Sequence, residues 1–206
     1  MLAHQLVEAL YCGGYSGCVL TNHFLSGNTS LDRKLKWEDF ITAYSSDYRF
    51  AKKFAEKYDI DIIFGLEEHI GEGKEILCYG VTPDILIANP ELASGNVQIW
   101  HRIMQENNCL CIQAHPFRSN GFIENPGVLP ARFIDGIEVF NAGNSETDNE
   151  AAEEFAVSNP CLIQLSGGDA HSVSRVCKGG IESPCRIRNE KELVEVLKSG
   201  KYNLIK

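Results

Sequence analysis

The segment Ser166-Gly167-Gly168-Asp169-Ala170-His171-Ser172 carries an acid and an imidazole two residues apart. It follows the apolar run 161–165, which we predict as a strand. Because side chains of an extended chain alternate with a period of two, Asp169 and His171 point to the same side if the strand continues to them. The pair could therefore bind a metal ion at a strand end. An acid beside a solvated histidine in a turn would leave the same pattern.

Three other apolar runs end in the same way. The endings are Thr21-Asn22-His23, Gly65-Leu66-Glu67 and Ala114-His115-Pro116. Each candidate ligand also has an interpretation without metal. His23 and His115 could cap helices or make hydrogen bonds at the rim, and Glu67 with Glu68 could be a solvated acidic pair. Taken together, five imidazole and carboxylate groups each follow a predicted strand: His23, Glu67, His115, Asp169 and His171. This mixture, without a thiolate, suits zinc, manganese or iron.

Short apolar runs alternate along the chain with amphipathic stretches. We predict helices over 2–12, 37–57 with a break near Ser45-Ser46, 96–106, 148–157 and 189–199, and strands over 15–20, 60–64, 76–80, 84–88, 109–113, 134–141, 161–165 and 180–182. The alternation predicts an α/β protein with mostly parallel strands. In such folds functional groups gather where strands end. Pro116 should end strand pairing and leave His115 at the rim.

Composition restricts the class of protein. The 206 residues fit a single domain over 1–206, and a net charge of −9 argues against a broad face that binds nucleic acid. We find no apolar run of about 18 residues and no basic region before an apolar core, so we expect neither a membrane span nor a signal peptide. Of the eight cysteines, several lie in apolar runs and none forms Cys-x-x-Cys, which favours the reducing cytoplasm.

The ordered motifs resemble those of the PHP domain, the polymerase and histidinol phosphatase superfamily. Its members show Thr-Asp-His, Gly-x-Glu, Ala-His-Pro, Gly-Ile-Glu-Val and Ser-Asp-Ala-His motifs after an N-terminal His-x-His strand. This chain has the three endings above, then Gly136-Ile137-Glu138-Val139 and Gly168-Asp169-Ala170-His171. The resemblance covers nearly the whole chain. It implies a distorted seven-stranded (β/α) barrel with two or three divalent ions (Zn, Mn or Fe) that hydrolyses phosphate esters by metal-activated water.

The resemblance also implies a role for each candidate ligand. Glu67 would bridge two ions, and His115 would bind one of the ions that Glu67 shares. Asp169 would bind together with the N-terminal pair of histidines. His23 and His171 would serve the remaining ion.

The chain departs from the family pattern at three places. No His-x-His precedes the first predicted helix, so we expect the first strand to be missing, through truncation or a start placed too far downstream. Asn22 stands where the family has Asp. Glu75 stands where many relatives supply a further histidine, which makes it a candidate metal ligand, with a surface charge as the alternative and His69 as a nearby substitute. His4, expected to be exposed, and His101 should lie outside the site.

Two arginines follow the candidate ligands closely. Arg118 and Arg175 could bind the substrate, because a guanidinium group matches the geometry of a phosphate. The alternative is a pair of solvated loop arginines. Glu138 and Asn141 could orient the metal ligands, although Glu138 could instead pair with a neighbouring base.

The sequence therefore predicts a metal-dependent phosphoesterase that acts on a small phosphomonoester or a short nucleotide-type ester. One alternative, motivated by the absent His-x-His, is a weakened PHP-like module that binds metal or phosphate. Another is a metallohydrolase of the amidohydrolase type. A missing first strand should leave an exposed edge beside the strand leading to His23, and a homo-oligomer could cover that edge.

Overall fold

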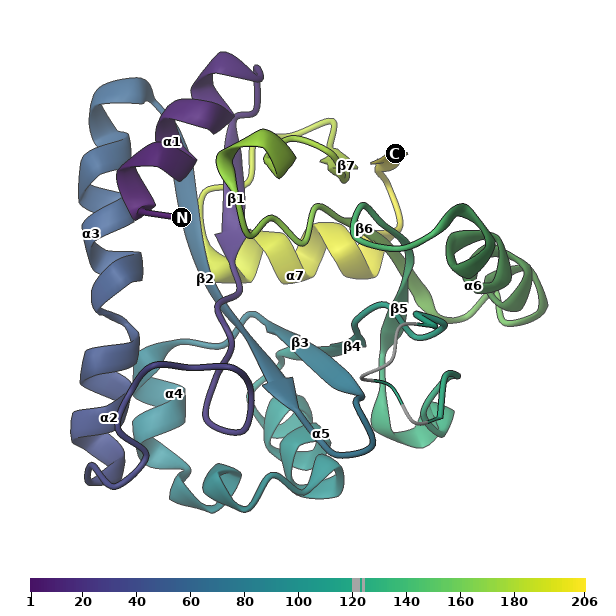
Figure 1. The fold of residues 1–206 in the computed structure, drawn as a ribbon, viewed down its shortest axis with the longest axis horizontal. Helices are drawn as coiled ribbons and strands as arrows, with labels where there is room; N and C mark the ends of the chain where they lie inside the picture. Colours follow the sequence, from purple (N-terminus) through teal and green to yellow (C-terminus); the bar gives the residue numbers. More distant parts are fainter. Residues whose placement is uncertain (120–122, 124) are drawn as a thin grey trace.

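Six of the predicted apolar runs form one curved sheet in the computed structural model, which describes residues 1–119, 123 and 125–206 (Figure 1). In spatial order its strands are β1 Gly17–Leu20, β2 Asp61–His69, β3 Glu75–Tyr79, β4 Leu110–Gln113, β5 Gly136–Asn141 and β6 Ile163–Gly167. A separate antiparallel pair consists of β7 Gly180–Glu182 and β8 Asn203–Ile205. The architecture is a mixed α/β half-barrel, as predicted in outline.

The helices lie around the sheet. They are α1 Ala3–Cys12, α2 Trp37–Tyr44, α3 Ser46–Ala55, α4 Pro83–Ala88, α5 Val97–Glu106, α6 Glu146–Ser158 and α7 Glu190–Ser199. The predicted break near Ser45 is confirmed, because α2 ends there and α3 begins at the next residue. Among the described residues, we find no helix with the length and apolar character needed to cross a membrane.

The prediction of a strand over 84–88 was wrong, since these residues belong to α4. Thr82 caps this helix by accepting a 3.3 Å hydrogen bond from the Ile85 N–H group. Pro83 occupies the first turn, where its missing N–H group costs nothing. A short apolar run is compatible with a strand and with a buried helix. Here Thr82 followed by Pro83 favours the helix.

β2 is longer than the predicted run 60–64 and includes Glu67 and Glu68. Beyond the reach of β1, it pairs with the antiparallel β3, which places Glu67 opposite Leu77 and His69 opposite Glu75. β3 is also antiparallel to β4, whereas the other neighbouring pairs of the sheet are parallel. Glu67 is therefore inside a strand, not at a strand tip, with the β3 ladder on one side and an isolated bridge to His23 on the other.

The predicted count of seven barrel strands is not confirmed. The described residues give six strands in the main sheet, with β1 and β6 at its two edges. In this part of the chain β1 pairs with β2 alone, and its four residues are all half-buried. One edge of β1 is thus open, as expected beside the segment that leads to His23.

Candidate metal centre

The backbone around His23 is tied to the middle of β2. The Phe24 N–H group donates to the Glu67 carbonyl at 2.7 Å, and the Glu67 N–H group donates to the Asn22 carbonyl at 3.1 Å. The buried Phe24 ring makes an edge-on contact with Tyr44, whose hydroxyl also donates to the Asn22 carbonyl. These contacts continue the pairing of the sheet past the end of β1 and fix His23 beside Glu67.

Four of the predicted ligands meet at one point. The His23 Nδ1 atom lies 3.0 Å from Oε2 of Glu67 and 3.6 Å from Oε1 of Glu75. The His115 Nε2 atom lies 3.1 Å from Oε2 of Glu75 and 3.6 Å from Oε1 of Glu67. Each carboxylate therefore contacts both imidazoles. Glu75 faces this cluster and not the solvent, and ligand atoms of His23, Glu67 and Glu75 all lie within 4.8 Å of one another.

These residues fit a divalent cation. Nδ1 of His23 is buried and makes no aligned hydrogen bond, even though a carboxylate oxygen is only 3.0 Å away. A buried polar atom without a partner is costly, and a metal ion would supply one. Two imidazoles and two carboxylates are a donor set suited to zinc, manganese or iron.

Opposite charges stabilise the arrangement of the cluster. Burial disfavours the His115 cation, but hydrogen bonds with Glu67 and Glu75 outweigh it and raise the pKa of the imidazole to about 9. Contact with the Glu67 carboxylate likewise raises the pKa of His23. Burial would raise the pKa of Glu67, yet its close contacts with the two histidines lower it to about 2. A bound cation would therefore replace protons on the imidazoles.

The metal-free protein is expected to lose stability as the pH rises from about 6.5 to about 9. A histidine whose folded pKa is raised stabilises the fold fully below its unfolded pKa, and this stabilisation is lost as the pH passes its folded value. The shift corresponds to about 3 kcal/mol in the free energy of unfolding. Thermal unfolding in a chelator should show this loss for the wild type and a much smaller one for His115→Asn. An equal loss of thermal stability with rising pH in both proteins would contradict a raised pKa of His115.

Asp169 and His171 lie next to His23. Nδ1 of His171 is 3.3 Å from Oδ1 of Asp169, and the rings of His171 and His23 are 5.8 Å apart. Arg118 donates to Asp169 over 2.5 Å. The side chain of His171 is 70% exposed, so it lies at the mouth of the site. Arg175 is exposed at the end of the short turn Val173–Arg175, which follows His171 along the chain.

Two of the candidate ligands have unusual backbones. His115 has a φ of 29° and Asp169 a φ of 43°, in the left-handed region that non-glycine residues rarely adopt. Such conformations cost of the order of 1 kcal/mol or more each and persist where the surroundings enforce them. His115 lies at the end of β4 as predicted, but it is buried, not at an open rim.

Glu138 enforces the position of His115. Its Oε2 atom accepts from the His115 N–H group at 2.9 Å and from Nδ2 of Asn141 at 2.8 Å. Oδ1 of Asn141 in turn accepts from Arg118 at 2.8 Å, and Arg118 reaches Asp169. The predicted orienting pair therefore connects the two halves of the site. Sequence reasoning missed Asn144, which accepts from Nε of Arg118 at 2.8 Å; no local motif marks it.

Gly167→Ala is expected to weaken metal binding by about 10- to 100-fold, the range typical for losing a group that orients ligands. A β-carbon at this position would lie 1.8 Å from Oε1 of Glu138 and would displace that carboxylate. The matched control is Gly168→Ala, where the nearest atom would be 4.0 Å away. Isothermal titration with Mn²⁺ measures both affinities. Similar losses in both variants would argue against a role for the Glu138 position.

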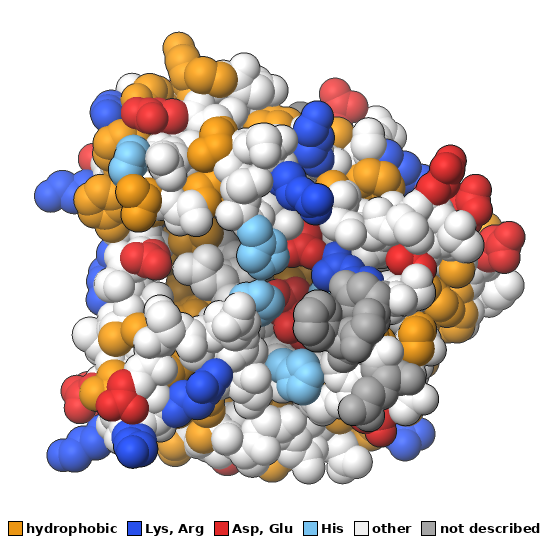
Figure 2. Space-filling model, viewed as in Figure 1, with side chains coloured by type: hydrophobic (Ala, Val, Ile, Leu, Met, Phe, Trp, Pro, Cys, Tyr) orange, Lys and Arg blue, Asp and Glu red, His pale blue; other side chains and the backbone are white. Residues whose placement is uncertain are grey.

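Of the remaining histidines, His69 is paired opposite Glu75 across β2 and β3 and so neighbours the cluster, whereas His101 and His4 are on helices. His69 is at the end of β2, His101 is on α5, and His4 is on α1, where its ring packs 5.9 Å from that of Phe54 and is half-buried, not exposed as expected. The predicted alternative of a solvated acidic pair was wrong, because both Glu67 and Glu68 are buried. Figure 2 shows histidine and acidic side chains side by side in the middle of one face of the molecule, with basic side chains next to them.

Comparisons with solved structures show the same fold in other proteins. The chain aligns over 99% of its length with 60% of a two-domain protein from Bacteroides vulgatus that contains a predicted PHP-like metal-dependent phosphoesterase, with a TM-score of 0.67 and 13% identity. A candidate metal-dependent phosphoesterase from Bifidobacterium adolescentis gives a TM-score of 0.56 and 13% identity, with 95% of this chain and 90% of that one covered. An amidohydrolase from Chromobacterium violaceum gives 0.60 and 12%, with 96% and 92% covered.

No protein-family model matches the sequence, and no match was found among curated proteins. At these identities the structural likenesses concern the fold. The predicted resemblance to PHP-type proteins is confirmed at that level: the chain has a fold shared with PHP-like metal-dependent phosphoesterases.

Proposed function

We propose that this chain is a metal-dependent phosphoesterase of PHP type that hydrolyses a phosphomonoester or a small nucleotide-type ester. The observation that carries the proposal is the pair of carboxylates, Glu67 and Glu75, each in contact with both His23 and His115. The shared fold supports it, since two proteins described as phosphoesterases have that fold.

The cluster would hold at least one divalent cation through His23, Glu67, Glu75 and His115. Asp169 and His171, next to His23, are the candidate ligands for a second. Divalent cations held there would activate water and neutralise the charge on phosphoryl oxygens. The residues of the chain contribute the rest: Glu67 keeps the two histidines in place, and Glu138 fixes the strained backbone of His115.

Arg118 is the candidate for orienting the phosphate. Its guanidinium group donates hydrogen bonds to three oxygens, from Asn141, Asn144 and Asp169, which fix its position. A guanidinium fixed in this way can donate to phosphate oxygens without losing further side-chain freedom. Arg175 is exposed, and a role in substrate binding would require its loop to fold over the substrate.

Two other functions remain alternatives. A metal- or phosphate-binding module without turnover is one of them, since the cluster could bind a cation without hydrolysing an ester. An amidohydrolase is suggested by the likeness to the Chromobacterium protein. Both share the metal cluster with the proposed enzyme, so only turnover distinguishes them.

The test combines elemental analysis with an assay of aryl phosphate and aryl amide hydrolysis by the same preparation. The proposal expects at least one equivalent of transition metal and release of phosphate, abolished by a chelator and restored by Mn²⁺ or Zn²⁺. Metal without release of phosphate supports the module, and cleavage of the amide alone supports the amidohydrolase. Chelator-resistant hydrolysis would contradict all three.

The open edge of β1 supports a further proposal, that two chains associate there. An unpaired strand edge readily pairs with another chain. Light scattering of the wild type should then give the mass of a dimer, and Val19→Pro should shift it toward a monomer, because proline removes a backbone donor from β1. A monomeric wild type at micromolar concentration would contradict the proposal.

A further inference from the structure

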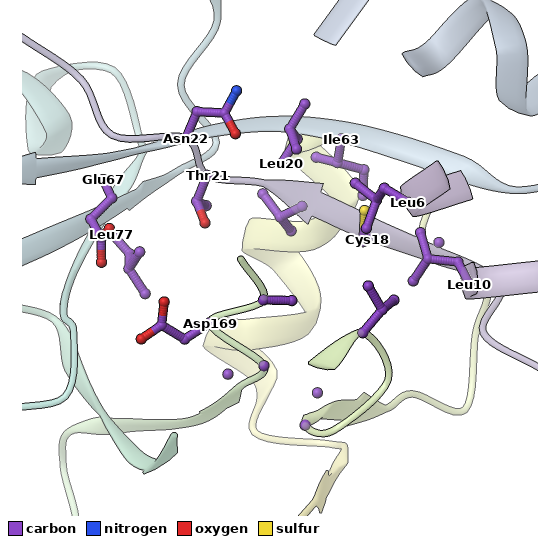
Figure 3. Close-up of a pocket in the computed structure, with 18 of the residues that line it drawn as sticks. Leu6, Leu10, Cys18, Leu20, Thr21, Asn22, Ile63, Glu67, Leu77 and Asp169 are labelled. Carbon is purple, nitrogen blue, oxygen red and sulfur yellow. The ribbon is translucent and has the colours of Figure 1, made fainter. Parts of the chain in front are cut away.

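Glu68 is a fully buried carboxylate that the proposed function does not use. Because side chains alternate along a strand, Glu68 faces the side of β2 opposite to Glu67, whose carboxylate points into the pocket that Asp169 also lines (Figure 3). On its own side of the strand, Glu68 follows Phe64 and Leu66, which belong to an apolar core cluster. Glu68 therefore ends a row of core side chains behind the metal centre.

The burial of this carboxylate lowers the stability of the fold. Its Oε1 atom is buried and has no hydrogen-bond partner among the residues that the structure describes. Burial also raises the pKa of Glu68 to about 7, because the charged form is poorly solvated there. An apolar side chain would stabilise the core better at this position, which points to a role of the carboxylate other than stability.

The second carboxylate oxygen of Glu68 holds a turn of the chain. Its Oε2 atom accepts a hydrogen bond from the Ser26 N–H group at 3.1 Å. The exposed Arg33 donates to the carbonyls on either side of Ser26, each at 2.7 Å. Two side chains from separate parts of the chain therefore fix the three consecutive residues 25–27.

The turn 25–27 packs against the imidazole of His23. The backbone of Gly27 lies so close to it that a β-carbon at Gly27 would be 3.0 Å from Cβ and 3.3 Å from Nδ1 of His23. This Nδ1 atom faces Glu67 and Glu75, and no aligned hydrogen bond from the described residues fixes its direction. Packing must therefore hold the ring, and the turn supplies the contact on the Nδ1 side.

We propose that Glu68 is a positioning residue of the metal centre, which holds the turn 25–27 against His23 and so keeps Nδ1 directed toward the two carboxylates. The buried Glu138 acts on His115 in the same manner, through a backbone N–H group at 2.9 Å. Each of the two histidines of the cluster then has a buried carboxylate that fixes it through the backbone. This inference rests on the metal centre of the proposed function and adds the residue that aligns His23.

Glu68→Leu and Glu68→Gln separate the hydrogen bond from the charge. Both substitutions remove the carboxylate, but glutamine can still accept from the Ser26 N–H group through its side-chain oxygen. Isothermal titration with Mn²⁺ at a fixed pH should give an affinity about 10- to 100-fold lower for Glu68→Leu than for Glu68→Gln. Two variants that bind Mn²⁺ equally well would overturn the inference.

Thermal unfolding of the same proteins distinguishes positioning from a structural role. Leucine removes a buried oxygen without a partner, and the released N–H group of the exposed Ser26 can bind water. Glu68→Leu should therefore unfold at a temperature no lower than that of the wild type, although it binds metal more weakly. A parallel loss of stability and metal affinity would assign Glu68 to the core and overturn the inference.

Gly27→Ala tests the contact with His23 while Glu68 stays in place. Gly27 does not have a positive φ, so alanine adds only its methyl group against the ring. The affinity for Mn²⁺ should fall about tenfold or more. Gly168→Ala, where the nearest atom would be 4.0 Å away, is the matched control and should bind as the wild type does. Equal affinities in the two alanine variants would overturn the inference.

A measurement on the metal-free protein separates this inference from the proposed function. NMR relaxation of the His23 imidazole reports how firmly the ring is held. A ring that is ordered in the wild type and in Glu68→Gln but mobile in Glu68→Leu supports the positioning role even if no metal binds, in which case the phosphoesterase proposal alone fails. A ring that is equally ordered in all three proteins would overturn the inference, whether or not the wild type binds Mn²⁺.

Discussion

Glu67→Gln is expected to weaken the binding of Mn²⁺ or Zn²⁺ by more than about 100-fold, beyond the loss seen when only an orienting group is removed. Glu67 lies within 3.6 Å of both His23 and His115, and its place in the middle of β2 holds it there. Glutamine keeps the shape of the side chain and removes its charge. The histidines then lose a counter-charge as well as a shared ligand, and phosphoesterase activity should fall with the metal affinity.

The matched control is Glu195→Gln, an exposed position on α7 where the nearest cation, Nζ of Lys191, is 3.9 Å away. Isothermal titration with both metals compares the two variants with the wild type, and thermal unfolding checks that both are folded. An affinity for Glu67→Gln within about threefold of that for the control would contradict the assignment of Glu67 as a metal ligand.

Arg118→Met is expected to lower kcat/KM for an aryl phosphate by about 100- to 1000-fold, as is typical when a positioned donor to a developing charge is removed. The methionine retains much of the side-chain volume but cannot donate to phosphate. Arg118→Lys should recover little, because an ammonium group cannot reproduce the fork of contacts to Asn141, Asn144 and Asp169.

Arg132→Met provides the control, since Arg132 is exposed and its guanidinium lies over the Phe133 ring, outside the site. Steady-state kinetics should be accompanied by titration with Mn²⁺. Retained metal affinity with lost turnover is the result expected for a phosphate-binding residue. A loss of metal affinity alone, with kcat unchanged at saturating metal, would instead assign Arg118 to holding Asp169.

Local patterns predicted the positions of most elements, because alternation and helical spacing reflect which side of an element is buried. Amphipathic spacing located α5 and α7, and Asn189 caps the latter as expected. The misassigned α4 carried a readable signal, the capping residue Thr82 followed by Pro83. No local sequence signal indicated that β3 runs antiparallel to its neighbours, because the residues of one strand do not determine the direction of the next.

The sequence predicts a set of candidate ligands but not their geometry. Asp169, His171 and His115 follow strands, so their convergence follows from the order of the sheet. The contact of Glu75 with both histidines depends on the hairpin that returns β3 along β2. Likewise, only the folded chain shows that Glu138 fixes the His115 backbone, since 23 residues separate them.

Anomalous X-ray diffraction from crystals soaked in Mn²⁺ or Zn²⁺ tests the central claim most directly. The account predicts an anomalous peak within coordination distance, about 2.0–2.2 Å for zinc, of His23, Glu67, Glu75 and His115. Absence of a peak there at saturating metal, or a peak bound elsewhere on the chain, would contradict it.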